Sequence, residues 1–242
     1  MIIVDLTINN REQVSLKEVL FSGTNKSKLE QLLKEYAYLE ELKKYQLKTN
    51  NKILLYGASG CGKTTTAKAL ANALGKPLII LNLSNIVSAK IGDTGRNVKF
   101  LFDKAAREKA ILFLDEFDQL GKMRTNDDQD VGEMRRLVNT LIQLIDYFPE
   151  EGIFIAATNF YELIDPALLR RFQLKLKFEL PTKDELDIYY NQLLDPFPLH
   201  LKSISRQYSI SYAEVKDYVH TEMKAKIIAE VENRRINHKI HG

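Results

Sequence analysis

The sequence predicts an α/β fold, in which a parallel sheet flanked by helices is followed by a small all-helical domain. Five short apolar segments alternate with stretches of helical periodicity between residues 51 and 181. Such apolar strands are typical of a parallel sheet that helices cover on both faces. After Pro181 the helical periodicity continues without a strand pattern. We therefore expect an N-terminal arm and helix (1–50), an α/β domain (51–181) and a helical lid domain with a C-terminal tail (182–242).

The composition of the 242-residue chain is that of an ordinary globular protein. Hydrophobic residues make up 45% and charged residues 28%. The 35 basic and 32 acidic residues leave a net charge of only +3, which makes a nucleic-acid partner a weak expectation. The single cysteine excludes an intrachain disulfide and a cysteine-based metal site. No membrane span or secretory signal is evident, so we expect a cytoplasmic protein without a membrane partner.

The chain before the predicted sheet contains an extended arm and one amphipathic helix. Residues 1–25 begin with an apolar run that ends at Asn9 and Asn10. The four residues from Ser27 to Glu30 resemble a capping box, in which Ser and Glu side chains satisfy free N–H groups at a helix start. Leucine and tyrosine side chains then follow at helical spacing. This pattern predicts a helix that begins near Ser27.

The elements of the two domains follow from apolar runs and from helix-start signals. Two further capping-box patterns, Thr182–Glu185 and Ser211–Glu214, open helices of the lid domain. The predicted strands of the α/β domain are Ile53–Tyr56, Leu78–Asn82, Ile111–Leu114, Ile153–Ala157 and Leu174–Phe178.

A complete G-x-x-x-x-G-K-T motif lies between the first predicted strand and the helix after it. Its glycines allow backbone N–H groups to turn toward phosphate oxygens at a helix N-terminus. Lys63 can reach the β- and γ-phosphates, and the Thr64 hydroxyl can bind Mg²⁺. The motif therefore predicts a nucleoside triphosphate site and an α/β domain of the P-loop NTPase type. The residues expected to bind the nucleotide here are Gly57, Ala58, Ser59, Gly60, Cys61, Gly62, Lys63, Thr64 and Thr65.

Two adjacent carboxylates, Asp115 and Glu116, end the third predicted strand. Ligands of open parallel sheets bind at the carboxyl ends of strands, so both acids should lie near the phosphates. Asp115 is placed to hold Mg²⁺. Glu116 can orient and deprotonate the attacking water.

Asn159, Arg170 and Arg171 follow the fourth predicted strand. Asn159 could hydrogen-bond the γ-phosphate, although Asn is also common where a strand enters a turn. The arginines suit the charge that develops on a transferred phosphoryl group. Taken alone, an arginine pair is more often a solvated helix face.

The order of these motifs resembles that of the classical AAA clade of the AAA+ ATPases. The motifs are GASGCGKT, ILFLDE, ATN and DPALLRRF, followed by a helical tail. The resemblance covers residues 25–235 and implies ATP and Mg²⁺ as ligands. It makes Asn159 the sensor 1 residue, and Arg170 and Arg171 arginine fingers that reach the neighbouring subunit. It therefore implies a homo-oligomeric ring, usually a hexamer. It also places Ala213 near the adenine and a pore loop at Lys90, Ile91 and Gly92.

The expected function is ATP hydrolysis in a ring that remodels or unfolds protein clients. Lys90 stands where the family usually has an aromatic residue, which weakens the case for threading of unfolded chains. We also expect no folded recognition domain before the ATPase module. Both features favour one alternative, an ATP-switched adaptor that recruits an effector such as a protease or nuclease. A DNA-acting ATPase of the loader type is a third reading, and the near-neutral charge disfavours it.

Overall fold

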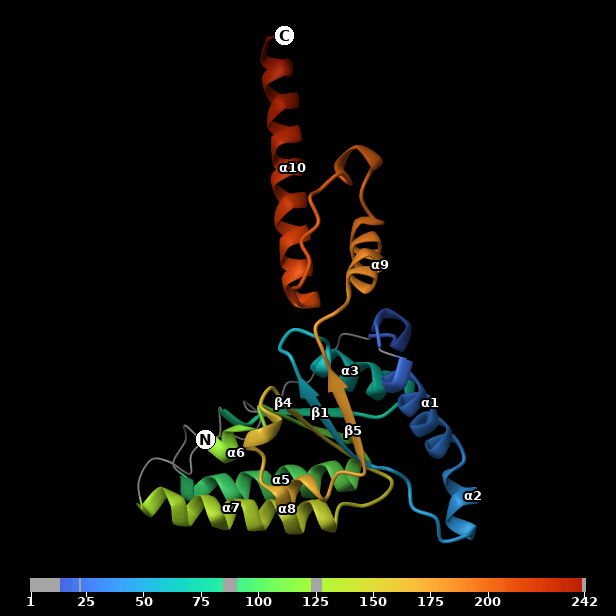
Figure 1. Cartoon of the computed structure of the whole chain (residues 1–242), viewed down its shortest axis with the longest axis vertical. Helices are drawn as coiled ribbons and strands as arrows, with labels where there is room; N and C mark the ends of the chain where they lie inside the picture. Colours follow the sequence, from blue (N-terminus) through green and yellow to red (C-terminus); the bar gives the residue numbers. More distant parts are fainter. Residues whose placement is uncertain (1–13, 22, 85–90, 123–127, 241–242) are drawn as a thin grey trace. The chain divides into compact units, whose positions relative to one another are not determined.

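The computed structural model describes residues 14–21, 23–84, 91–122 and 128–240, and Figure 1 shows the whole chain. Two compact units make up the chain. The α/β unit contains residues 1–57 and 63–178, and the helical unit contains residues 58–62 and 179–242. No helix in the described part of the chain is long and apolar enough to cross a membrane.

The α/β unit is built on a parallel sheet of five strands in the order β2-β3-β4-β1-β5. This sheet and the helical C-terminal unit confirm the predicted fold class. All five predicted strands are present, with ends that differ by at most one residue. The strands are β1 (Lys52–Gly57), β2 (Leu78–Asn82), β3 (Ile111–Asp115), β4 (Ile153–Thr158) and β5 (Leu174–Phe178).

Helices cover both faces of the sheet: α5 and α7 lie on one face, and α3 lies on the other (Figure 1). The central strands are therefore buried, including every residue of β4. The described helices of this unit are η2 (Leu16–Glu18), α1 (Gly23–Ala37), α2 (Leu39–Lys44), α3 (Lys63–Ala73), α5 (Ile91–Glu108), α6 (Gln119–Lys122), α7 (Asp128–Asp146), η4 (Tyr161–Leu163) and α8 (Pro166–Leu169).

Five phenylalanines form an aromatic cluster around Phe154 of β4. Phe154 of β4 packs against Phe102 of α5 and Phe172, with ring centroids 5.2 and 5.8 Å apart. Phe172 also meets Phe117 edge to face at 5.9 Å, and Phe148 joins from the end of α7. Such contacts stabilise the core beyond the area that they bury. The cluster anchors the turn after β3 and the segment after α8 to the same part of the core.

Helix α1 satisfies carbonyl groups of β5, the strand at one edge of the sheet. Asn25 is 6% exposed, and its Nδ2 atom donates to the Lys177 carbonyl at 2.7 Å. Lys28 donates to the Lys175 carbonyl at 3.2 Å. These side chains occupy acceptors that another strand could otherwise pair with.

The predicted capping box at Ser27 is wrong, because α1 already begins at Gly23. Ser27 lies inside the helix, and its hydroxyl donates to the Gly23 carbonyl at 3.1 Å. A serine in a helix can satisfy its hydroxyl in this way through the carbonyl four residues earlier. The S-x-x-E pattern therefore lies inside a helix that begins one turn earlier.

The helical unit contains α9 (Lys183–Leu194), η5 (Leu199–Leu201) and α10 (Tyr212–Ile240). Tyr190 of α9 is fully buried, and its hydroxyl donates to the Gln207 carbonyl at 3.1 Å. Both predicted capping boxes are present here. Thr182 and Glu185 cap α9. At α10, the Ser211 N–H and hydroxyl donate to Glu214 at 2.7 and 2.6 Å, and the Glu214 N–H donates back to the hydroxyl at 3.3 Å.

Candidate active site

The loop between β1 and α3 contains three glycines in backbone conformations that other residues rarely adopt. The φ angles of Gly57, Gly60 and Gly62 are 124°, 69° and 97°. A Cβ atom at Gly57 would lie 2.0 Å from the Phe178 carbonyl oxygen, so only glycine fits beside β5. A Cβ atom at Gly62 would meet no atom within 4 Å. Such glycines allow consecutive N–H groups to surround an anion.

Within the helical unit, Gly60 lies against the first residues of α10. Its carbonyl oxygen accepts a hydrogen bond from the Ala213 N–H at 3.1 Å. A Cβ atom at Gly60 would lie 2.5 Å from the Ser211 hydroxyl oxygen and 3.0 Å from the Ala213 Cβ atom. The structure therefore brings Ala213, which the family resemblance places near the adenine, next to Gly60 of the phosphate loop.

Lys63 begins α3 and is 8% exposed. Its Nζ atom donates to the Gly57 carbonyl at 2.8 Å and to Asn159 Oδ1 at 2.7 Å. Asn159 directly follows β4, which pairs with β1 in the sheet. Two of the predicted site residues, far apart in the sequence, thus meet through a charge-assisted hydrogen bond.

Thr64 and Asp115 also lie together, because α3 starts beside the carboxyl end of β3. The Thr64 hydroxyl donates to Asp115 Oδ2 at 3.1 Å. Burial raises the pKa of the Asp115 carboxyl above its ordinary value, while hydrogen bonds from the Glu116 N–H and the Thr64 hydroxyl act in the opposite direction. Mg²⁺ prefers oxygen ligands and commonly uses one or two carboxylates together with phosphates and water. This hydroxyl–carboxylate pair fits such an ion.

Glu116 lies in the turn after β3 with a φ of 55°, an unusual value for a residue other than glycine. Its Oε2 atom accepts a short hydrogen bond from the Ser84 hydroxyl. The same hydroxyl lies 2.5 Å from Asn82 Oδ1, at the end of the neighbouring strand β2. The side chain of Glu116 is therefore fixed by residues that follow β2.

The two arginines have different surroundings. Arg171 pairs with Asp146 at the end of α7, with Nε 3.3 Å from Oδ1, and its Nη1 atom donates to the Ala167 carbonyl at 3.0 Å. Arg170 directly follows α8, is exposed and makes no ion pair with any described residue. Within one chain, the structure does not bring either arginine together with Lys63 or Asp115 through a described contact.

Sequence reasoning missed three residues of this region: Ser84, Asp118 and Thr158. Ser84 holds Glu116, as described above. The Thr158 hydroxyl donates to Asp118 Oδ1 at 2.9 Å, and both side chains are buried. The sequence carries no local signal for them, because they meet only through the strand order, in which Asn82, Asp115 and Thr158 end three adjacent strands.

The structure describes only part of the predicted pore loop. Lys90 is not among the described residues. Ile91 and Gly92 are the first two residues of α5.

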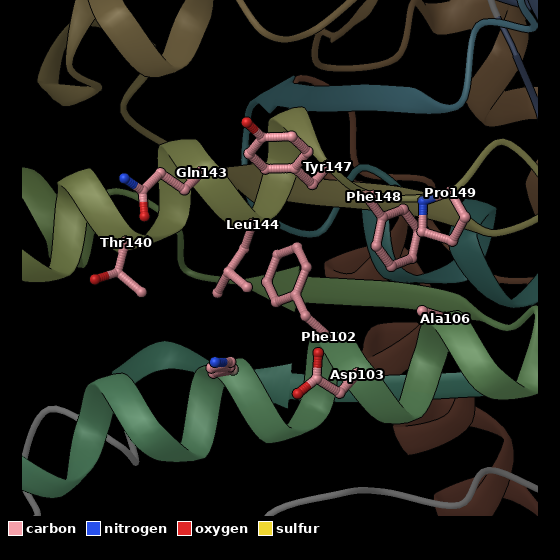
Figure 2. Close-up of a pocket in the computed structure, with 10 residues that line it drawn as sticks. Phe102, Asp103, Ala106, Thr140, Gln143, Leu144, Tyr147, Phe148 and Pro149 are labelled. Atoms are coloured by element: carbon pink, nitrogen blue, oxygen red, sulfur yellow. The ribbon is translucent and has the colours of Figure 1, made fainter.

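A separate groove of about 340 Å³ lies between α5 and α7 (Figure 2). Phe102 and Leu144 point toward each other between the two helices, and Tyr147 and Phe148 come directly after α7. Tyr147 is 88% exposed. The groove contains none of the predicted site residues; it is lined by Lys99, Phe102, Asp103, Ala106, Thr140, Gln143, Leu144, Tyr147, Phe148 and Pro149.

A parallel sheet whose first strand leads through a G-x-x-x-x-G-K-T loop into a helix defines the P-loop nucleoside triphosphatases. Comparison with known families makes the assignment more specific. The model of the ATPase family associated with various cellular activities (AAA) matches residues 53–180. The chain belongs to this AAA family and is an ATPase.

Relatives of known sequence agree with this family. The chain is 32% identical over 226 residues to the uncharacterized AAA family ATPase y4kL of Sinorhizobium fredii. This match covers 91% of this chain and 68% of the relative. It is 35% identical over 193 residues to a proteasome-associated ATPase of Nocardioides sp.. That match covers 70% of this chain and 33% of the relative. The proteasome-associated ATPase of Acidothermus cellulolyticus is 31% identical, over 83% of this chain and 38% of the relative. The chain thus spans about two thirds of the first relative, and 33% and 38% of the other two.

Proposed function

We propose that this ATPase works as a homo-oligomeric ring, a hexamer, in which ATP hydrolysis drives the remodelling or unfolding of protein clients. The observation that carries the catalytic part is the pair of contacts Lys63–Asn159 and Thr64–Asp115, at 2.7 and 3.1 Å. These contacts gather groups from α3, β3 and β4 at the carboxyl edge of the sheet, where ligands of parallel sheets bind.

In the proposed mechanism, residues 57–62 of the loop and Thr65 of α3 bind the phosphates. The ammonium group of Lys63 neutralises charge on the β- and γ-phosphates. Thr64 and Asp115 would hold Mg²⁺, which when bound neutralises charge on the β- and γ-phosphate oxygens. Asn159 hydrogen-bonds the γ-phosphate or the attacking water. Ala213 lies beside the adenine.

Glu116 is the proposed general base. Its Oε2 atom accepts from Ser84, while Oε1 makes no hydrogen bond to a described residue. Oε1 can therefore accept a proton from the water that attacks the γ-phosphorus atom. The bond between this phosphorus and the bridging oxygen breaks as the new P–O bond forms, and ADP leaves with its electron pair.

The variant Glu116→Gln tests this base. Without the carboxylate, ATP should bind nearly as well as in the wild type, while turnover falls on the order of 10²-fold or more. Binding is measured with a fluorescent ATP analogue and turnover by phosphate release. Glu108→Gln, in the last turn of α5, is the matched control and should behave as wild type. Normal turnover by Glu116→Gln would refute the assignment of the base.

We assign the role of arginine finger to Arg170, which would complete the site of the neighbouring subunit. Its exposure and its lack of a described ion pair support this choice, because a guanidinium that reaches across an interface must be free to move. Arg171 is better suited to hold the segment in place, because it is already paired with Asp146 at 3.3 Å. Dependence on a neighbouring subunit is the reason for proposing a ring.

Protein clients are proposed because two of the relatives are named proteasome-associated ATPases. The family resemblance makes Lys90, with Ile91 and Gly92 at the start of α5, the residues that would contact such a client. A pull-down with Glu116→Gln in ATP, compared with ADP, should retain client proteins only in ATP. An ATP-switched adaptor would instead support its effector equally well as wild type and as Glu116→Gln. Salt-sensitive retention of DNA would favour the loader reading. We place the protein in the cytoplasm, which its single cysteine supports.

A further inference from the structure

Asp118 is a buried carboxylate that the proposed mechanism does not use. It lies two residues after Glu116, and only 2% of its surface is exposed. Burial of a carboxylate is costly unless hydrogen bonds compensate for the lost water. Its Oδ1 atom accepts a hydrogen bond from the Thr158 hydroxyl at 2.9 Å. One residue earlier, the Phe117 N–H donates to the Ala157 carbonyl at 2.8 Å. Two adjacent residues of the turn after β3 are thus attached to the last two residues of β4.

Thr158 also fixes the backbone on the far side of Asn159. Its Oγ1 atom accepts a hydrogen bond from the Phe160 N–H at 2.9 Å, and this bond spans Asn159. Thr158 itself is only 1% exposed, so water does not compete for these bonds. Asn159 therefore extends from a backbone segment that is held at both ends, and its Oδ1 atom lies 2.7 Å from Lys63 Nζ.

We propose that Asp118 is a positioning residue for ATP hydrolysis, which acts through the Thr158 hydroxyl to set the position of Asn159. The inference rests on the proposed role of Asn159 at the γ-phosphate. A hydroxyl has one hydrogen and two lone pairs. The hydrogen of the Thr158 hydroxyl is donated to Asp118, so a lone pair of the same oxygen is directed toward the Phe160 N–H. Loss of the hydroxyl frees the segment that carries Asn159, and a misplacement of about 1 Å can lower kcat on the order of 10²-fold.

The pair of variants Thr158→Val and Thr158→Ser tests this role in the full chain. Valine keeps the shape of threonine without the hydroxyl, whereas serine keeps the hydroxyl. We expect Thr158→Val to lower kcat roughly 10- to 100-fold, with the Kd for ADP changed by less than about threefold because ADP has no γ-phosphate. Thr158→Ser should retain most of the wild-type kcat. Equal kcat losses in both variants, or no loss in Thr158→Val, would overturn the inference.

A double-mutant cycle separates positioning from a purely structural contribution. If Thr158 acts only through Asn159, then Thr158→Val combined with Asn159→Ala should have the same kcat as Asn159→Ala alone. Losses of kcat that multiply in the double variant would contradict the relay. Asp118→Ala should reproduce the kcat of Thr158→Val where it folds, as judged by its thermal unfolding midpoint. The Thr158 variants test the relay even if Asp118→Ala does not fold.

The same kcat measurements distinguish failure of this inference from failure of the proposed mechanism. If Asn159→Ala hydrolyses ATP at the wild-type rate, then the assigned role of Asn159 is wrong, and the relay fails with it. If Asn159→Ala loses turnover while Thr158→Val keeps it, then the mechanism stands and only the relay is overturned. Glu116→Gln, measured alongside, shows whether the assay reports turnover by this site.

Discussion

At the scale of single residues, Gly60 and Gly62 share a positive φ but differ in their surroundings. A side chain at Gly60 would meet Ser211 at 2.5 Å, whereas one at Gly62 would meet nothing within 4 Å. The contacts of Gly60 belong to the start of α10, since Ala213 donates to its carbonyl. The backbone conformation therefore favours glycine at both positions, whereas close packing excludes a side chain only at Gly60.

We predict that Gly60→Ala destabilises the protein more than Gly62→Ala in the absence of nucleotide. Both variants carry the strain of a left-handed residue, about 1–2 kcal/mol. Only Gly60→Ala adds a steric clash, which in well-packed sites costs on the order of 1–3 kcal/mol. Chemical denaturation of the two variants measures the difference. Equal free energies of unfolding would show that the close approach of Ser211 to Gly60 contributes nothing.

At the scale of elements, α8 shows how a short helix positions a functional group. Asp165 caps α8, because its side chain accepts from the Ala167 N–H at 2.7 Å. Arg171 then connects the end of this helix to Asp146 of α7. Phe172 is buried in the aromatic cluster immediately afterwards. A four-residue helix is thus held by a cap, an ion pair and a core side chain around the exposed Arg170.

We predict different phenotypes for the two arginines. Arg170→Ala should lose on the order of 10³-fold in turnover, typical of a missing arginine finger, with an unchanged unfolding temperature. Arg171→Ala should lower the unfolding temperature, because it removes the connection to α7. Asp146→Asn serves as the matched variant, since it weakens the same connection without touching either arginine. A large turnover defect in Arg171→Ala but none in Arg170→Ala would reverse the assignment.

The capping box of α10 makes the start of this helix sensitive to acid. Hydrogen bonds from the Ser211 hydroxyl and then from the Ser211 N–H lower the pKa of Glu214 below its ordinary value of 4.5. A carboxyl with a lowered folded-state pKa binds fewer protons when folded. Its stabilising contribution is therefore present above the unfolded-state pKa and lost as the pH falls through the folded-state value.

We accordingly predict that protection of the Ser211 and Glu214 amides against hydrogen exchange falls as the pH is lowered below about 4.5. The measurement is amide exchange by NMR, corrected for intrinsic exchange rates. Glu214→Gln should show weaker protection at neutral pH without this fall. Glu232→Gln, which changes an exposed carboxyl further along α10, should leave the fall intact. Unchanged protection of the wild type down to pH 3 would contradict this prediction.

At the scale of the whole molecule, the sequence predicts the sheet well because its strands are buried on both faces. Runs such as Ile111–Leu114 and Ile153–Ala157 are short and wholly apolar, which is typical of interior strands of a parallel sheet. Ser27 shows where local pattern fails, because a helix that starts at Gly23 can contain the same four residues. The S-x-x-E pattern therefore does not show whether the helix has a further turn before it.

The polar contacts of the site are harder to predict than the strands. Asp118 and Thr158 are ordinary residues in the sequence and become partners only because β3 and β4 are neighbours in the sheet. The same holds for Ser84 and Glu116, which meet because β2 and β3 are adjacent. Strand order, which the sequence pattern does not specify, therefore decides which side chains meet.

The central claim is that each ATP site needs an arginine from another copy of the chain. Neither Arg170→Ala nor Glu116→Gln should hydrolyse ATP at an appreciable rate alone. In a mixture, an Arg170→Ala subunit supplies an intact Glu116, and a Glu116→Gln neighbour supplies an intact Arg170. The ATP site of the Arg170→Ala subunit then has both groups wherever its arginine comes from a Glu116→Gln neighbour. The decisive measurement is the rate of phosphate release by the equimolar mixture. The ring model predicts that turnover reappears on mixing, whereas a mixture as inactive as its two components would contradict it.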